Sequence, residues 1–142
     1  MSGQTPESNA IVICDHAIQE VGTGKWSLIG IFSQIHSAQF PVVHRQLCVY
    51  LNFTDAQGHY DFRLELINLN QEDESALVRI DGEGDLADML AHNEMVFNLQ
   101  NIQFNHAGKY EFRFWANNTI VAQKVFRVIQ LEQEPPGEGG DA

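Results

Sequence analysis

The sequence predicts an all-β fold, an antiparallel β-sandwich of about eight short strands with one short helical turn. Two observations favour this class. Apolar and polar residues alternate over 47–53 and again over 60–69, which is the pattern of strands with one buried and one solvated face. Clusters of Gly, Asn, Asp and Pro recur between the apolar segments, and regular turn signals of this kind indicate a sandwich or barrel rather than alternating strands and helices.

Eight segments rich in β-branched and aromatic residues are the expected strands: 10–19, 25–35, 47–53, 60–69, 76–83, 94–104, 109–116 and 120–131. The first two flank the turn residues 21–24 and are expected to form a hairpin. This turn and Lys25 look like the end of a phosphate-binding loop, but Trp26 stands where that loop has Ser or Thr. Residues 85–92 are the predicted helical turn, with Asp85 as its N-cap.

The last two strands flank Asn117-Asn118-Thr119, a hairpin signal because asparagine tolerates positive φ. Two pairings are open at this point. A two-residue turn places Phe114 opposite Val121, and a three-residue turn places it opposite Ala122. We prefer the three-residue turn because it brings three more apolar residues to the core face. These are Ile120, Phe126 and Val128.

The segment 107–112, Ala-Gly-Lys-Tyr-Glu-Phe, resembles the tyrosine corner of immunoglobulin-like sandwiches. In that corner a tyrosine hydroxyl anchors the start of a strand, two residues before a core position. Phe112 would occupy the position at which antibody domains have a cysteine. Phe112 and Phe114 share the parity of Tyr110, so all three side chains are expected in the core. The sandwich is therefore predicted to be immunoglobulin-like.

A single domain is expected at residues 9–131, because a chain of 142 residues has the length of one ordinary domain. Residues 1–8 are polar and contain a proline. Residues 132–142 are acidic, rich in Pro and Gly, and have no apolar side chain larger than alanine. Both ends are predicted to be disordered, since they cannot bury enough surface to offset the entropy of ordering.

The net charge of −11 comes from 19 acidic and 8 basic residues. Such a charge opposes binding to nucleic acid or to an anionic membrane, and it favours a basic protein partner or a metal ion. The sequence has neither an apolar run long enough to span a membrane nor a targeting pattern at its start, so a cytoplasmic location is expected. In that compartment Cys14 and Cys48 are expected to be free and buried.

No catalytic motif stands out in the sequence. The nucleophile motif Gly-x-Ser-x-Gly does not occur. Asp15 and His16 are neighbours on an expected strand, so their side chains point to opposite faces and do not bond to each other. We therefore assign no catalytic residue and no cofactor, and we expect a protein that is not an enzyme.

Metal-binding spacings are also missing, since there is no His-x-x-x-His or Cys-x-x-Cys. Six scattered histidines are present: His16, His36, His44, His59, His92 and His106. Carboxylates gather at 72–74 and again at Asp81, Glu83, Asp85 and Asp88, without the spacing of a calcium loop. A solvated acidic surface explains them, and no metal ligand is assigned.

The tryptophans are the strongest candidates for an interaction surface. Trp115 has the parity opposite to Phe112 and Phe114, and it shares a face with Arg113. Trp26 stands at the start of its strand. An exposed tryptophan can anchor a protein interface or stack on a sugar ring. Alternatively, Trp115 covers its own sheet with Arg113 over its ring.

Five segments resemble a bacterial family of small uncharacterised proteins, known only as a domain of unknown function: 10–18 (AIVICDHAI), 24–32 (GKWSLIGIF), 40–44 (FPVVH), 97–102 (FNLQNI) and 108–112 (GKYEF). The resemblance covers about residues 10–129. It implies a small β-sandwich and carries over no catalytic or binding residue.

The function expected from the sequence is that of a non-enzymatic module acting through protein contacts, with a homo-oligomer as one form of such contact. Recognition of a small ligand or carbohydrate by Trp26, Trp115 or Tyr60 is the first alternative. A metal-dependent enzyme built from distant side chains is the second. Which of these applies depends on whether the fold brings together Asp15, His16, His44 and Asp61, and this requires the strand order.

Overall fold

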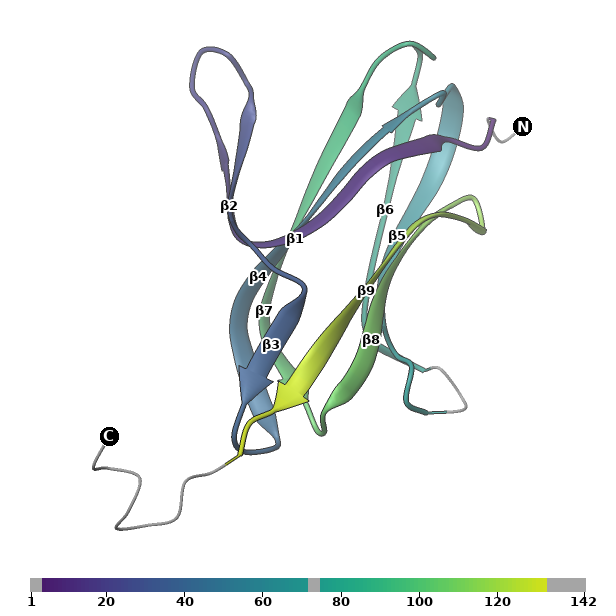
Figure 1. The fold of residues 1–142 in the computed structure, drawn as a ribbon. Helices are drawn as coiled ribbons and strands as arrows, with labels where there is room; N and C mark the ends of the chain where they lie inside the picture. Colours follow the sequence, from purple (N-terminus) through teal and green to yellow (C-terminus); the bar gives the residue numbers. More distant parts are fainter. Residues whose placement is uncertain (1–3, 72–74, 133–142) are drawn as a thin grey trace.

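The computed structural model describes residues 4–71 and 75–132, and within them the chain forms nine strands in two packed sheets and no helix (Figure 1). The strands are β1 (Glu7–Gln19), β2 (Trp26–Ile31), β3 (Gln34–Ser37), β4 (Val42–Thr54), β5 (Gly58–Asn68), β6 (Ala76–Leu86), β7 (Asn93–Phe104), β8 (Gly108–Ala116) and β9 (Thr119–Gln130). The predicted all-β sandwich is confirmed.

One sheet has the order β2-β1-β4-β7 and the other the order β3-β9-β8-β5-β6. Neighbouring strands are antiparallel except β3 and β9, which are parallel. The predicted hairpin of β1 and β2 is confirmed. The expected strand 25–35 is instead two strands, because Gly30 has a φ of 72° and the chain crosses to the other sheet after Ile31. This crossing is the source of the ninth strand.

The core lies between the sheets. It is filled by the side chains that the alternation of apolar and polar residues along the strands predicts to be buried. In β4 the residues of one parity, from Leu47 to Phe53, are at most 2% exposed. Phe62 of β5 and Phe114 of β8 stack with ring centroids 5.5 Å apart, and Phe53 of the opposite sheet lies 5.8 Å from each. Aromatic contacts therefore join the two layers.

The tyrosine corner is present at the start of β8. The Tyr110 hydroxyl donates a hydrogen bond to the carbonyl oxygen of His106 at 2.7 Å, and the ring is 1% exposed. Phe112 and Phe114 are fully buried on the same side. These contacts are those of an immunoglobulin-like sandwich, as the sequence predicts.

The predicted helical turn at 85–92 is wrong. Asp85 still belongs to β6, because its register partner is His59 of β5. The chain then makes a single turn, closed by a hydrogen bond from the Ala91 amide to the Asp88 carbonyl at 3.1 Å. The Asp88 side chain accepts a hydrogen bond from the Leu90 amide at 2.9 Å, so the capping role falls to Asp88 rather than Asp85.

In the hairpin of β8 and β9, the predicted residue pairing is confirmed, but the predicted three-residue turn is wrong. Phe114 lies opposite Ala122, as predicted. The turn is nevertheless the two-residue turn Asn117-Asn118, with φ values of 50° and 65°, and a bulge beside Trp115 shifts the register by one residue. The bulge skips Val121 and places Ile120 opposite Trp115 on the outer face, so the Ile120 side chain is 36% exposed and lies outside the core.

The N-terminal boundary lies earlier than the predicted residue 9. Glu7 and Ser8 pair with β4, which corrects their assignment to a disordered segment. The Tyr60 hydroxyl donates to the Gln4 carbonyl at 2.5 Å and so holds the chain just before β1. Residues 1–3 and 133–142, predicted to be disordered, and the acidic residues 72–74 lie outside the described residues.

Residues 4–71 and 75–132 contain no helix of the length and hydrophobicity that crossing a bilayer requires.

Candidate functional site

Trp115 lies at the centre of a polar network on the outer face of the five-stranded sheet. Its indole nitrogen donates to a carboxylate oxygen of Glu65 at 2.8 Å. The guanidinium of Arg63, its direct cross-strand partner, lies 4.7 Å from the centre of its ring. Arg113 instead lies against Glu111, with the Nε–Oε1 distance at 2.5 Å. Arg63 covers the ring because it is directly opposite, whereas Arg113 is two residues away on the same strand.

Trp26 lies in the other sheet, as the first residue of β2, and is half-buried. Trp115 and Arg113 are on β8. The three residues predicted as an interaction surface are therefore divided between the two sheets. Of the two tryptophans, Trp26 lies in the less enclosed region.

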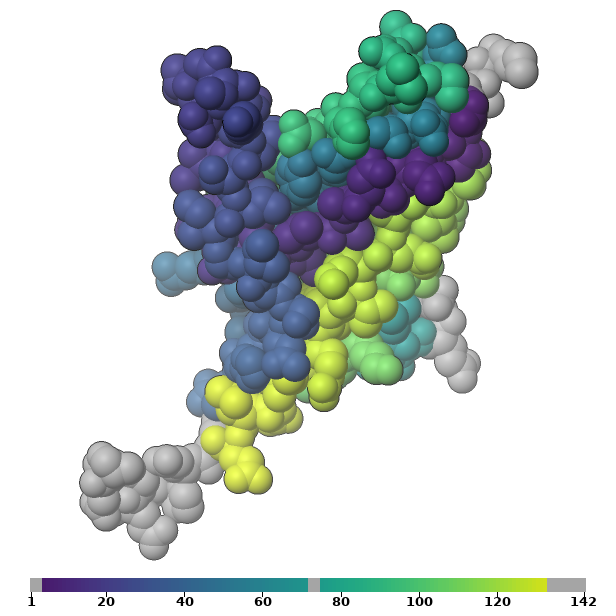
Figure 2. Space-filling view, turned by 45° about the horizontal axis from the view of Figure 1, so that its top comes forward, coloured from purple at the N-terminus to yellow at the C-terminus, as the bar shows by residue number. Residues whose placement is uncertain are grey.

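That region is a two-stranded ribbon formed where β1 changes its partner. Residues 7–14 of β1 pair with β4, whereas residues 14–19 pair with β2. Beyond Cys14 the hairpin therefore leaves the sheet, and it stands apart from the rest of the molecule (Figure 1; top left in Figure 2). Among the residues that the structure describes, β2 has no strand on its other side, so one row of its backbone groups is unpaired.

Apolar side chains are unusually exposed on this ribbon. Ile18, Ile29 and Ile31 share one face by their register and are 52%, 47% and 66% exposed. Val21, at the turn, is 98% exposed. An exposed apolar patch on a free sheet edge is a common mark of an interaction surface.

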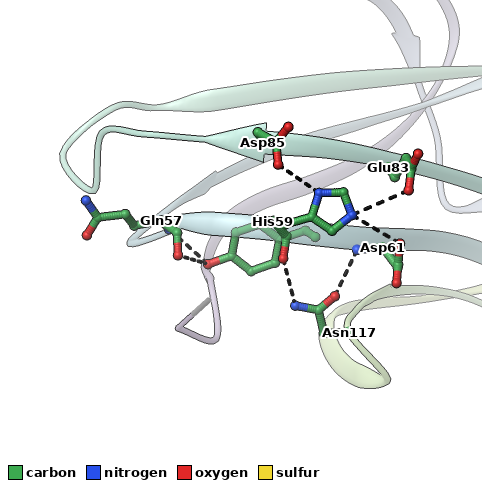
Figure 3. Close-up of polar contacts among 7 residues, drawn as sticks. Gln57, His59, Asp61, Glu83, Asp85 and Asn117 are labelled. Carbon is green, nitrogen blue, oxygen red and sulfur yellow. Dashed lines mark hydrogen bonds and ion pairs between the residues drawn. The ribbon is translucent and has the colours of Figure 1, made fainter. Parts of the chain in front are cut away.

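A second cluster lies on the five-stranded sheet, at the start of β5 and the end of β6 (Figure 3). The register places His59 opposite Asp85 and Asp61 opposite Glu83, all on the solvent face. His59 Nδ1 lies 2.8 Å from Asp85 Oδ1 and forms a hydrogen bond with it. His59 Nε2 faces Asp61 Oδ1 at 3.6 Å and Glu83 Oε2 at 3.4 Å. One imidazole thus contacts three carboxylates.

Asn117, from the turn between β8 and β9, fixes the backbone of this cluster (Figure 3). Its side-chain oxygen accepts from the Asp61 amide at 2.8 Å, and its side-chain nitrogen donates to the His59 carbonyl at 3.2 Å. Its own amide donates to the Asp61 carbonyl at 2.9 Å. These three bonds continue the β5–β8 ladder beyond its last backbone pair and make the strand end rigid.

The hydrogen bond with Asp85 raises the pKa of His59 above its usual 6.5, and the charges of Asp85, Glu83 and Asp61 act in the same direction. Desolvation is the second-largest cause and acts in the opposite direction. The folded state therefore favours the protonated imidazole. Any stability from this cluster is fully present below pH 6.5 and is lost as the pH rises through the raised pKa.

The fold does not place the four candidate residues Asp15, His16, His44 and Asp61 at one site. Asp61 lies on β5, in the five-stranded sheet, whereas Asp15 and His16 of β1 and His44 of β4 lie in the other sheet. The ring of His44 packs against Phe32 at 5.8 Å. Asp61 instead lies 3.6 Å from His59 and opposite Glu83 in the register, two residues that the sequence reasoning named but did not assign to a site.

Cys14 and Cys48 are cross-strand partners at the point where β1 leaves β4, and both are free and buried. Burial, followed by the charge of Cys48, raises the pKa of the Cys14 thiol. The Cys48 thiol donates to Asn98 Oδ1 at 2.8 Å. A buried thiol with a raised pKa is a poor nucleophile, so Cys14 is not suited to nucleophilic catalysis.

This protein is a small immunoglobulin-like β-sandwich domain. Its two sheets are mainly antiparallel, its core is aromatic, and a tyrosine corner lies at the start of β8. It belongs to the family of unknown function DUF6941, whose model matches residues 9–129. None of the curated proteins matches the sequence.

Many solved structures are similar to this domain, and two of them illustrate the likeness. The alkylpurine DNA glycosylase AlkC of Pseudomonas fluorescens, solved with DNA containing an abasic-site analogue, matches 89% of this chain with a TM-score of 0.53 and 6% identity. The chain spans only 31% of the length of that glycosylase. An immunoglobulin-like protein of Pseudomonas aeruginosa matches 91% of this chain and 100% of its own, with a TM-score of 0.43 and 9% identity. The likeness to the glycosylase shows a shared fold alone.

Proposed function

We propose that this domain is a non-enzymatic binding module that takes up an extended segment of a partner protein along the free edge of β2. The proposal rests on one observation: at Cys14, β1 stops pairing with β4 and pairs with β2 instead. As a result, no second layer covers the ribbon within the described residues, and one edge of β2 is unpaired. Strand addition to such an edge supplies main-chain hydrogen bonds, and the adjoining side chains give specificity.

The ribbon supplies side chains for specificity on both of its faces. One face carries Ile18, Ile29 and Ile31, and the other carries the half-buried Trp26 and Leu28. Partner side chains that alternate along an added strand would contact both faces. Aromatic and aliphatic anchors of this kind contribute most of the binding energy at protein interfaces.

The charge of the chain indicates the chemistry of the partner. At a net charge of −11, a second copy is repelled, whereas a basic segment is attracted. The ribbon has its own carboxylates at Asp15 and Glu20 beside the apolar side chains. We therefore assign a partner segment that alternates apolar residues with Lys or Arg. The same charge disfavours nucleic acid and anionic membranes, and the two buried free thiols support a cytoplasmic location.

Replacement of Ile29 by glutamate is expected to weaken partner binding by about tenfold or more, because it places a charge in the apolar face. The probe is a displayed library of extended eight-residue segments selected against the full chain. Selected segments should alternate apolar and basic residues and should bind the Ile29→Glu and Ile18→Glu variants poorly. Affinities are measured by calorimetry with synthetic peptides.

The matched control is Leu90→Glu, which changes an 86% exposed leucine outside the ribbon and should alter affinity less than about twofold. Far-ultraviolet circular dichroism verifies that every variant is folded. Selected peptides without basic residues, or with equal affinity for wild type and Ile29→Glu, would contradict the proposal. Dimerisation of the wild type that Ile29→Glu abolishes would also contradict it, since the ribbon would then bind a second copy.

A further inference from the structure

The cluster on β5 and β6 has the atom spacing of a metal site. In a tetrahedral zinc site with bonds of about 2.0–2.2 Å, two ligand atoms lie about 3.3–3.5 Å apart. His59 Nε2 lies 3.4 Å from Glu83 Oε2 and 3.6 Å from Asp61 Oδ1. One ligand atom from each of these residues lies within 4.8 Å of the others. Two of the three edges of a tetrahedral face are therefore already present, and the carboxylates of Asp61 and Glu83 can complete the third by rotation of their exposed side chains.

The same distances show that His59 Nε2 does not form a normal hydrogen bond with the carboxylate of Asp61 or with that of Glu83. Hydrogen bonds from N–H to oxygen measure about 2.7–3.2 Å, so both contacts of Nε2 are longer than a normal bond. Within the described part of the chain, the contact of the ring that has hydrogen-bond length is at Nδ1, with Asp85 at 2.8 Å. Nε2 therefore points at two carboxylate oxygens without forming a good bond to either.

Asp85 gives the imidazole the orientation that a metal ligand needs. Histidines that bind metals almost always donate their other ring N–H to a carboxylate, a carbonyl or water. In the neutral form of His59, the hydrogen bond at Nδ1 holds the proton there and leaves the lone pair of Nε2 directed at Asp61 and Glu83. The arrangement is thus a carboxylate–histidine pair aimed at two further ligands (Figure 3).

The rest of the surroundings favour a cation at this point. Within residues 4–71 and 75–132, His59 is the one basic side chain in ion-pair contact with Asp61, Glu83 and Asp85. The nearest arginine on β6, Arg79, is paired with Asp81 at 3.1 Å instead. The three bonds from Asn117 hold the backbone at His59 and Asp61, so the main chain that carries two of the three ligands is fixed by the fold.

We propose that His59, Asp61 and Glu83 bind one Zn²⁺ ion, with Asp85 as the positioning residue of His59. Imidazole nitrogen together with two carboxylate oxygens suits zinc, whereas calcium and magnesium prefer sites made of oxygen alone. Three protein ligands leave the fourth position open to water or to a carboxylate of another molecule. The ion would join the ends of β5 and β6 on the face away from the core.

The test uses the full chain, treated with chelator and then titrated with zinc chloride. Calorimetry should show saturable binding of one Zn²⁺ per chain. Amide cross-peaks in nitrogen–proton correlation spectra should shift at residues 59–61 and 83–85, and calcium chloride at the same concentration should leave them in place. The variants Asp61→Asn and Glu83→Gln should each weaken binding by at least about tenfold, because groups that merely orient metal ligands already contribute about 10- to 100-fold.

The positioning role of Asp85 is tested by Asp85→Asn, which keeps the shape of the side chain and should weaken zinc binding by about tenfold or more. Asp81→Asn is the matched control, since it removes one charge from the same face of β6 and should change affinity less than about twofold. The altered side chains of Asp61, Glu83 and Asp85 are 76%, 71% and 85% exposed, so each variant is expected to fold.

Three outcomes would overturn the zinc site. They are the absence of saturable binding, shifts confined to other parts of the chain, and equal weakening by Asp81→Asn and Asp61→Asn. The site lies in the sheet opposite to the β1–β2 ribbon, so its failure leaves the proposed peptide binding unaffected.

Discussion

Replacement of Phe114 by alanine is expected to lower the free energy of unfolding by about 3–5 kcal/mol, the range for deletion of a fully buried phenylalanine. Phe114 is fully buried and lies at the centre of the aromatic contacts between the sheets. Its ring contacts Phe62 of its own sheet and Phe53 and Phe97 of the other, with centroids 5.5–6.3 Å apart. The change therefore removes contacts with both layers and leaves a cavity that neither sheet can close alone.

Urea denaturation measures this effect, and the slope against denaturant should be unchanged if the native fold is retained. A loss of this size corresponds to a melting temperature lower by roughly 10–15 °C for a domain of this length. Phe114→Leu is the control, because it keeps an apolar side chain of similar volume and should cost less than about 1.5 kcal/mol. A loss below about 1 kcal/mol in Phe114→Ala would show that Phe114 does not join the two sheets.

The position of Phe114 could be predicted because the side-chain period of a strand is two. Once Tyr110 is placed in the core, Phe112 and Phe114 follow by parity, and the structure confirms all three. The same argument correctly assigns the buried residues of β4 and β5. Parity depends only on neighbours along the chain, so it needs no knowledge of which strands are adjacent.

For the last hairpin, the sequence predicts the correct residue pairing but not the structural cause of that pairing. Burial of the apolar side chains requires Phe114 to lie opposite Ala122, and this was predicted. The sequence reasoning attributed the shift to the length of the turn. In the structure, Asn117 and Asn118 form the two-residue turn that their positive φ values allow, and a bulge beside Trp115 provides the extra residue. Local sequence patterns do not distinguish these two routes.

Neither candidate site could be found from the sequence, because the metal cluster depends on the register between β5 and β6, and the ribbon depends on where β1 stops pairing with β4. Alternation along a strand places His59 and Asp61 on one face of β5, and Glu83 and Asp85 on one face of β6. Only the pairing of β5 with β6 places them opposite each other. The intervening segment around 69–75 has no turn signal that fixes this register. Likewise, the exposure of the ribbon follows from the departure of β1 from β4 at Cys14, which hydrophobic periodicity does not reveal.

Replacement of Tyr110 by phenylalanine is expected to cost about 1–3 kcal/mol, although it removes a single oxygen atom. The hydroxyl donates to the His106 carbonyl at 2.7 Å from a ring that is 1% exposed. The phenylalanine ring fills the same space against Phe104 and Phe126, so packing is retained. What is lost is the hydrogen bond that holds the loop before β8, and a carbonyl in a partly buried loop is left without its partner.

Thermal and urea unfolding at neutral pH measure this loss, with Tyr50→Phe as the control. The hydroxyl of Tyr50 bonds to the exposed side chain of Glu94 on the outer face, where water can replace it, so about 0.5 kcal/mol or less is expected there. Equal losses in the two variants would show that the tyrosine corner has no special role in stability.

The pH dependence of the Tyr110→Phe effect tests whether the phenol is buried in the folded state. Burial raises the pKa of Tyr110 above its usual 10.0. Below pH 10 the phenol is protonated in both the folded and the unfolded state, and its full contribution to stability is present. As the pH rises through the raised pKa, the unfolded state loses the proton first and the contribution falls. The difference in stability between wild type and Tyr110→Phe should therefore shrink above pH 10, whereas a phenol that is exposed to solvent in the folded state would leave the difference constant.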